Sequence, residues 1–252
     1  MKFSEVSAAV AAIARGELVL VADDESRENE GDLILAAEAA TSAKIAFMVQ
    51  HTSGILCVGA RAGRLDALRL PLMVPENTES HQTAFTVSVD YRHGTSTGIS
   101  AADRALTIRA LADESASPSD FARPGHVFPL RARARGVLER PGHTEAACDL
   151  AELAGFSPLG VLAEVVGAEG EMARRPELFQ FAWRFGLEII SIAQLVEYRR
   201  GVADSAAPRE QSVVAEQRSA VRSIDSSQRL RATSSIGTAP ALAPVPHYAT
   251  KE

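Results

Sequence analysis

Short apolar runs alternate with helical patterns through the first 200 residues, and this alternation limits the fold more than any other feature. Leu18–Ala22 and Leu33–Ala37 are apolar runs typical of buried strands. Residues 84–89 alternate and are rich in β-forming side chains. Strands interleaved with helices predict an α+β fold, in which a single-domain α/β sandwich has a mixed sheet flanked by helices.

Capping residues set several of the expected boundaries. Ser4 can cap a helix that ends just before Gly16, Thr41 can cap another, and Ser100 with Asp103 resembles a capping box. The sequence predicts helices at 4–15, 41–50, 100–111, 145–154, 177–185 and 192–200. It predicts strands at 18–22, 33–37, 54–58, 84–89, 161–166 and 187–190.

The character of the chain changes after Arg200. Residues 201–252 are rich in Ala, Ser, Arg, Gln and Pro and show little periodicity. Such a composition is typical of disordered linkers. We therefore expect one folded domain over 1–200 and a low-complexity, disordered tail over 201–252.

Charge and cysteine content narrow the classes of function. Six Lys/Arg and five Asp/Glu fall beyond residue 200, which leaves 20 basic and 27 acidic groups in the body of the chain. An acidic body does not attract nucleic acid, so a phosphorylated ligand would need a local basic pocket. No apolar run reaches the roughly 18 residues of a membrane span, and no signal peptide is evident. Two cysteines without a Cys-x-x-Cys pair predict a cytoplasmic protein without a disulfide framework or structural zinc.

The densest local signal is the acidic segment from Asp23 to Asp32. It crowds six carboxylates around Arg27 between two apolar runs. Like charges repel unless a cation offsets them, and Mg²⁺ or Mn²⁺ prefers such oxygen ligands. The alternative is a solvated acidic loop, although Arg27 and Gly31 within the run are not required by a plain loop.

A four-residue repeat presents two histidines. Arg123-Pro124-Gly125-His126 recurs as Arg140-Pro141-Gly142-His143, and Pro-Gly marks a turn. The second copy precedes Thr144 and a helix, so it could hold a phosphate at a helix start while His143 binds a metal. Two ordinary turns with exposed histidines are the alternative.

Three weaker signals remain open. The loop Gly94–Ser100 could hold ligand oxygens or could simply be a capped loop. Glu164 in an apolar strand could face solvent or act as a general acid or base in a pocket. Cys57 is a buried apolar residue or, less expectedly, a reactive thiol.

In this order the motifs resemble 3,4-dihydroxy-2-butanone 4-phosphate synthase, a family of riboflavin synthesis. The resemblance spans residues 4–200 and rests on the stretches 23–32, 97–104, 123–130, 142–147 and 172–174. It implies an α+β homodimer with active sites near the subunit interface. Many relatives carry a fused GTP cyclohydrolase II domain with a three-cysteine zinc site, whereas no cysteine follows Arg200 here.

The resemblance also implies a reaction and residue roles. D-ribulose 5-phosphate would become L-3,4-dihydroxy-2-butanone 4-phosphate and formate, by metal-assisted enediol formation, dehydration, skeletal rearrangement and loss of one carbon, with Mg²⁺ or Mn²⁺. Glu28 and His143 would bind the metal, and His126 and Glu164 would be catalytic. Thr97 and Cys57 would line the pocket. The implied substrate contacts are Arg27, Glu28, Asp32, Arg140, Pro141, Gly142, His143, Thr144 and Glu164.

Two other functions stay open from the residues alone. One is a different metal-dependent lyase or isomerase of sugar phosphates. The other is a non-catalytic binding protein that uses its tail for interaction.

Overall fold

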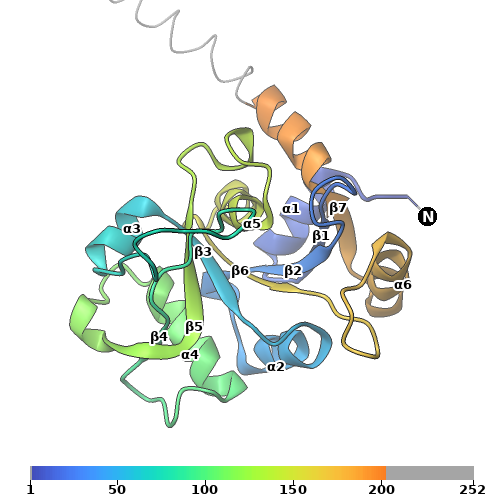
Figure 1. Ribbon diagram of the computed structural model, residues 1–252. Coiled ribbons are helices and arrows are strands. Elements are labelled where there is room, and N and C mark those ends of the chain that lie inside the picture. Colours follow the sequence, from blue (N-terminus) through green and yellow to red (C-terminus); the bar gives the residue numbers. More distant parts are fainter. Residues whose placement is uncertain (1, 203–252) are drawn as a thin grey trace, which may run out of the picture. The chain divides into compact units, whose positions relative to one another are not determined.

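A computed structural model describes residues 2–202 and contains a seven-stranded mixed sheet (Figure 1). The strand order is β4-β5-β3-β6-β2-β1-β7. β1 pairs in parallel with β7 and β3 with β5, while the other pairs are antiparallel. The strands are β1 Val19–Ala22, β2 Gly31–Ala36, β3 Cys57–Arg61, β4 Val89–Tyr91, β5 Phe121–Ala132, β6 Leu159–Glu164 and β7 Glu188–Ser191.

Helices cover both faces of this sheet, so the predicted sandwich is confirmed. Figure 1 shows α1 and α5 on one face and α2 on the other. The interior strand β2 is buried on both faces: Leu33 and Leu35 join the core with α2 and α4, whereas Ile34 and Ala36 join the core with α1 and α5. The helices are α1 Val6–Ala14, α2 Ser42–His51, α3 Ala62–Ala67, α4 Ala101–Ala112, α5 His143–Leu153, α6 Arg175–Phe185 and a last one over 192–202.

Two of the three predicted N-caps are confirmed. Ser4 is not the cap of α1, because the N-cap is Glu5 and makes no side-chain cap bond. The Thr41 side chain accepts the Lys44 amide, and the Ser100 side chain accepts the Asp103 amide. Gly16 follows α1 with a φ of 76°, a left-handed conformation that glycine adopts without a steric penalty. The Asp103 carboxylate does not complete a capping box, because it accepts hydrogen bonds from Ser96 and the Gly98 amide.

The prediction of one continuous strand over 84–89 is wrong. Phe85 bridges to Leu130 of β5, and the next residue, Thr86, bridges to Leu72. A segment that changes partner within two residues cannot extend either ladder, so regular pairing begins only at Val89 in β4. β3 begins three residues later than the expected range of 54–58.

The strand β5 was not predicted, and it contains the first Arg-Pro-Gly-His copy. Pro124, Gly125 and Pro129 all disfavour a strand when read locally. In the fold, however, Phe128 and Pro129 pair with Cys57 and Val58 of β3. The turn predicted for the first copy is therefore wrong, whereas the second copy leads directly into α5, two residues earlier than expected.

The predicted tail lies outside the described residues, apart from 201 and 202, which continue the last helix. Within residues 2–202, none of the helices combines the length and apolar character that a membrane crossing requires.

Candidate active site

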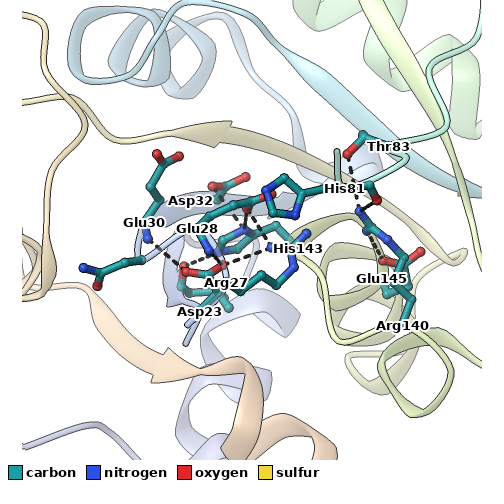
Figure 2. A network of polar contacts seen from close by, with 12 residues as sticks. Asp23, Arg27, Glu28, Glu30, Asp32, His81, Thr83, Arg140, His143 and Glu145 are labelled. Carbon is teal, nitrogen blue, oxygen red and sulfur yellow. Dashed lines mark hydrogen bonds and ion pairs between the residues drawn. The ribbon is translucent and has the colours of Figure 1, made fainter. Parts of the chain in front are cut away.

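A cavity of about 400 Å³ opens where β2 and β6 meet the start of α5. Figure 2 shows Glu28, Asp32 and His143 close together, with Arg140 and Glu145 to one side. The predicted site residues that line the cavity are Arg27, Glu28, Asp32, Cys57, Arg140, His143, Thr144 and Glu164.

Strand register places Asp32 beside Glu164. The two residues are partners across β2 and β6, and paired residues point to the same face of a sheet. Glu164 is exposed, but Asp32 is only 3% exposed, and its Oδ1 atom is buried with no hydrogen-bond partner within the described part of the chain. Burial raises the pKa of Asp32 to about 7. The positive charge of His143 lowers this pKa, and the negative charge of Glu164 raises it further. The pair offers two carboxylates of different environment at one end of the cavity.

The acidic segment forms a turn organised by Asp23. This buried carboxylate accepts the amides of Glu28 at 3.1 Å and Glu30 at 2.9 Å and pairs with Arg27 at 3.0 Å. The turn is therefore not a plain solvated loop, since one of its carboxylates is used to shape it.

His143 joins this turn to α5. Its Nδ1 lies 3.5 Å from Glu28 Oε2 and 3.6 Å from Asp32 Oδ1, and its Nε2 lies 3.1 Å from the Val21 carbonyl. Burial opposes a charge on the imidazole, but the neighbouring carboxylates prevail and raise the pKa of His143 to about 9. Burial likewise opposes ionisation of Glu28, yet His143 and Arg27 lower its pKa to about 2.

Three side chains converge closely enough to share a cation. Ligand atoms of Asp23, Glu28 and His143 all lie within 4.8 Å of one another. Two carboxylates and an imidazole form a donor set that suits a divalent cation. The structure thus places Asp23 beside the two candidate ligands predicted from sequence.

The start of α5 and Arg140 form the basic side of the cavity. Gly142 is the N-cap and makes no side-chain cap bond, as a residue without a side chain must. Arg140 Nη1 donates to Glu145 at 2.8 Å, and its Nη2 donates to the carbonyl of His81 at 3.0 Å. An arginine beside a helix N-terminus is an arrangement that binds anions. Pro141 and Gly142 shape this turn but do not line the cavity.

A loop that the sequence did not indicate supplies Glu79, His81 and Thr83 to the lining. The Glu79 carboxylate accepts the amides of His81 at 2.8 Å and Thr83 at 2.9 Å, and these bonds lower the pKa of Glu79 to about 2. Glu30 also lines the cavity without having been predicted. A polar stretch between apolar segments was the only local signal for the loop, and it is typical of any surface loop.

Two further predicted residues, besides Pro141 and Gly142, do not line this cavity within the chain. His126 lies in β5, where its Nδ1 is 2.7 Å from Asp90 Oδ2 and its amide donates to Asp90 Oδ1 at 2.9 Å. Thr97 is exposed in the loop before α4. Cys57 does line the cavity, but burial raises the pKa of its thiol well above the usual range, which argues against a reactive thiolate.

Curated relatives match about 200 residues of this chain, and they differ in how much of their own length that match covers. The 3,4-dihydroxy-2-butanone 4-phosphate synthase of Agrobacterium fabrum is 57% identical over 201 residues, which cover 80% of this chain and 94% of the relative. The bifunctional riboflavin biosynthesis protein RIBA 1 of Arabidopsis thaliana is 54% identical over 200 residues, but those residues cover only 37% of that longer protein.

Solved structures agree with this relationship. A 3,4-dihydroxy-2-butanone 4-phosphate synthase in complex with two magnesium ions is 48% identical, with a TM-score of 0.75, and the match covers 78% of this chain and 96% of that one. A cation-free form of such a synthase gives the same TM-score at 46% identity. The model of the synthase family matches residues 7–198. The chain therefore belongs to the 3,4-dihydroxy-2-butanone 4-phosphate synthase family, lyases that make this four-carbon phosphate for riboflavin biosynthesis.

Proposed function

We propose that this protein converts D-ribulose 5-phosphate into L-3,4-dihydroxy-2-butanone 4-phosphate and formate. The observation that carries the proposal is the convergence of Glu28, Asp32 and His143 on one cavity that also contains Glu164 and Arg140. The route is enediol formation, loss of water, a shift of the carbon skeleton and release of one carbon. The two products together hold the atoms of the substrate, so the water lost is taken up again.

The residues present fit a divalent cation. Asp32 Oδ1 is a buried acceptor without a hydrogen-bond partner in residues 2–202, and it faces His143 beside Glu28. Glu28 and His143 would hold Mg²⁺ or Mn²⁺, with Asp23 close enough to contribute. When bound, the cation supplies electrostatic stabilisation of negative charge on the enediol oxygens.

The side chains divide the remaining work between them. Glu164 and Asp32 lie side by side and can carry protons to and from the carbon next to the carbonyl. Arg140, Thr144 and the first amides of α5 bind the phosphate, and this anchors the substrate in one orientation. Arg27 is a substrate contact held in place by Asp23 and Glu28.

His126 acts from a second subunit in this proposal. It does not line the cavity in its own chain, but its bond to Asp90 orients the imidazole in the way that catalytic histidines are oriented. A homodimer with sites near the subunit interface would bring His126 of one chain to the cavity of the other. The loop with Thr97 belongs to the same region, because the Cβ that Gly98 lacks would lie 2.0 Å from Asp90.

Formate release from D-ribulose 5-phosphate tests the reaction. We expect formate from the wild-type protein with Mg²⁺, none with a chelator, and at least a hundredfold loss in Glu28→Ala and His143→Ala, since each removes a proposed ligand. Glu25→Ala is the matched control, because Glu25 lies in the same turn but its contact is with Arg175.

Product analysis by NMR separates the alternatives. A different sugar-phosphate lyase or isomerase would consume the substrate without formate, and that outcome would overturn the proposal. Undiminished formate production by both folded variants would overturn the metal assignment.

A further inference from the structure

The motif Met172-Ala173-Arg174 has no part in the proposed chemistry, yet it ends against the acidic turn. Arg174 Nη1 donates to the carbonyl of Glu28 at 2.9 Å and to the carbonyl of Asn29 at 2.8 Å. We propose that Arg174 is a positioning residue that holds Glu28 in the conformation needed to bind the divalent cation. The inference rests on the proposed function of Glu28.

The acidic turn is constrained from inside by its amides. Asp23 accepts the amides of Glu28 and Glu30, and Asp24 accepts the amide and hydroxyl of Ser26. None of these bonds uses the carbonyls of Glu28 and Asn29, which accept hydrogen bonds from Arg174 outside the turn. Asn29 has a φ of 55°, a left-handed conformation that is uncommon outside glycine, although Asn adopts it more readily than most residues, and its amide donates to the carbonyl of Asp24 at 3.2 Å. Arg174 therefore constrains the turn from outside.

The chain places Arg174 at this position through a short return from β6. Val165 donates to the carbonyl of Gly31 at 2.9 Å, Val166 bridges to Met172, and Ala173 donates back to Val165 at 3.0 Å. The next residue is Arg174, so its side chain starts beside the end of the turn. The amide of Arg174 donates to Glu177 at 2.6 Å, which fixes its backbone at the start of α6.

Packing supports the same placement. Leu178 of α6 is buried against Gly31, where an added Cβ would lie 2.6 Å from Leu178 Cδ1. Because Gly31 follows the turn directly, α6 and the turn are held as one unit. The side chain of Arg174 is half exposed, so its position does not depend on burial in the core.

Two explanations for Arg174 predict opposite signs. A nearby positive charge repels a bound cation, so removing it would tighten metal binding if charge alone mattered. If Arg174 instead orients the ligand Glu28, removing it would weaken metal binding. Loss of a residue that orients a metal ligand typically lowers metal affinity about 10–100-fold. The direction of change in metal affinity therefore distinguishes positioning from electrostatics.

Mn²⁺ binding to the enzyme without substrate, measured by electron paramagnetic resonance, tests the inference. We expect Arg174→Ala to raise the Kd for Mn²⁺ about 10–100-fold, and Arg174→Lys, which keeps a donor, to lie between it and wild type. Arg175→Ala is the matched control, because Arg175 contacts the exposed Glu25 at 3.1 Å instead of the turn's carbonyls. Hydrogen exchange in a peptide covering 24–30 should rise in Arg174→Ala and stay unchanged in Arg175→Ala.

Wild-type or tighter Mn²⁺ binding by folded Arg174→Ala would overturn the inference, as would an equal loss in Arg175→Ala. If Arg174→Ala does not fold, Arg174→Gln is judged by the same Kd. Glu28→Ala reports on the proposed function separately. Unchanged Mn²⁺ binding in Glu28→Ala would overturn the ligand assignment itself, and with it the positioning role, whereas loss in Glu28→Ala with none in Arg174→Ala would overturn the positioning role alone.

Discussion

Glu145 is a buried carboxylate whose position decides where Arg140 points. It is 1% exposed, accepts Arg140 Nη1 at 2.8 Å and accepts the Arg133 amide at 3.0 Å. It also lies in the first turn of α5, where a negative charge is stabilised by the helix dipole. Its negative charge thus offsets the positive charge of Arg140 while leaving Nη2 directed at the cavity loop.

We predict that Glu145→Gln raises KM for D-ribulose 5-phosphate about tenfold and changes kcat less. A hydrogen bond to a charged group contributes about 1.5–3 kcal/mol, and its loss frees the guanidinium that we propose binds the phosphate. Steady-state kinetics of formate release would measure both parameters. Glu152→Gln is the control on the same helix, because Glu152 lies near the C-terminal end of α5 and contacts Arg61 and Arg199 instead of Arg140. An unchanged KM in Glu145→Gln would contradict the prediction.

At the scale of elements, two glycines let α5 approach the sheet closely. Gly59 of β3 and Gly160 of β6 are cross-strand partners beneath the helix. A Cβ on Gly59 would lie 2.6 Å from the Thr144 carbonyl, and one on Gly160 would lie 2.5 Å from the Ala147 carbonyl. Both contacts are with backbone, which cannot rotate away. The two glycines therefore determine how closely α5, which contains His143 and Thr144, packs against the sheet.

We predict that Gly160→Ala lowers the free energy of unfolding by about 1–3 kcal/mol, the usual cost of overpacking a well-packed core. Gly63→Ala, in α3 with nothing near the added Cβ, should instead raise it by up to about 1 kcal/mol, because alanine is the better helix former. Urea denaturation would measure both. Equal changes in the free energy of unfolding in the two variants would show that the close approach of α5 does not cause the loss of stability in Gly160→Ala.

For the whole molecule, the proposed dimer makes a complementation test possible. If His143 of one chain works with His126 of the other, a hybrid of His126→Ala and His143→Ala subunits has one intact site and one doubly altered site. Random mixing in equal amounts makes half of the dimers hybrids, so about a quarter of the wild-type activity should return. Formate assays before and after subunit exchange measure this. If formate-producing activity does not return after subunit exchange, His126 and His143 do not form one site across the two chains.

The proposed domain over 1–200 leads to a second prediction at this scale. A chain ending at residue 202 should keep kcat/KM within about twofold of the full protein, because both core clusters and the cavity lie within the described residues. The Agrobacterium fabrum relative supports this, since 94% of its length is matched by 201 residues here. A large loss of activity in the folded truncation would assign the remaining residues a part in catalysis.

The sequence by itself determined the order and type of most elements, and it supplied the candidate site residues. Thr41, Ser100 and Gly16 marked helix ends because caps depend on bonds between near neighbours. The apolar runs marked β1 and β2 because strands buried on both faces need continuous apolar side chains. The long motifs also identified the family, although β5 was missed, since its prolines and glycine are tolerated only by pairing with a distant strand.

Only the tertiary structure decided how these residues meet. The register of β2 against β6 set Asp32 beside Glu164, and the seating of α5 brought His143 to Glu28. It likewise showed that Asp23 shapes the turn, that the loop with His81 lines the cavity and that His126 does not reach it within its own chain. The physical reason is that strand pairing and helix seating depend on contacts between residues far apart in the chain, which leave no periodic or local signal in the sequence.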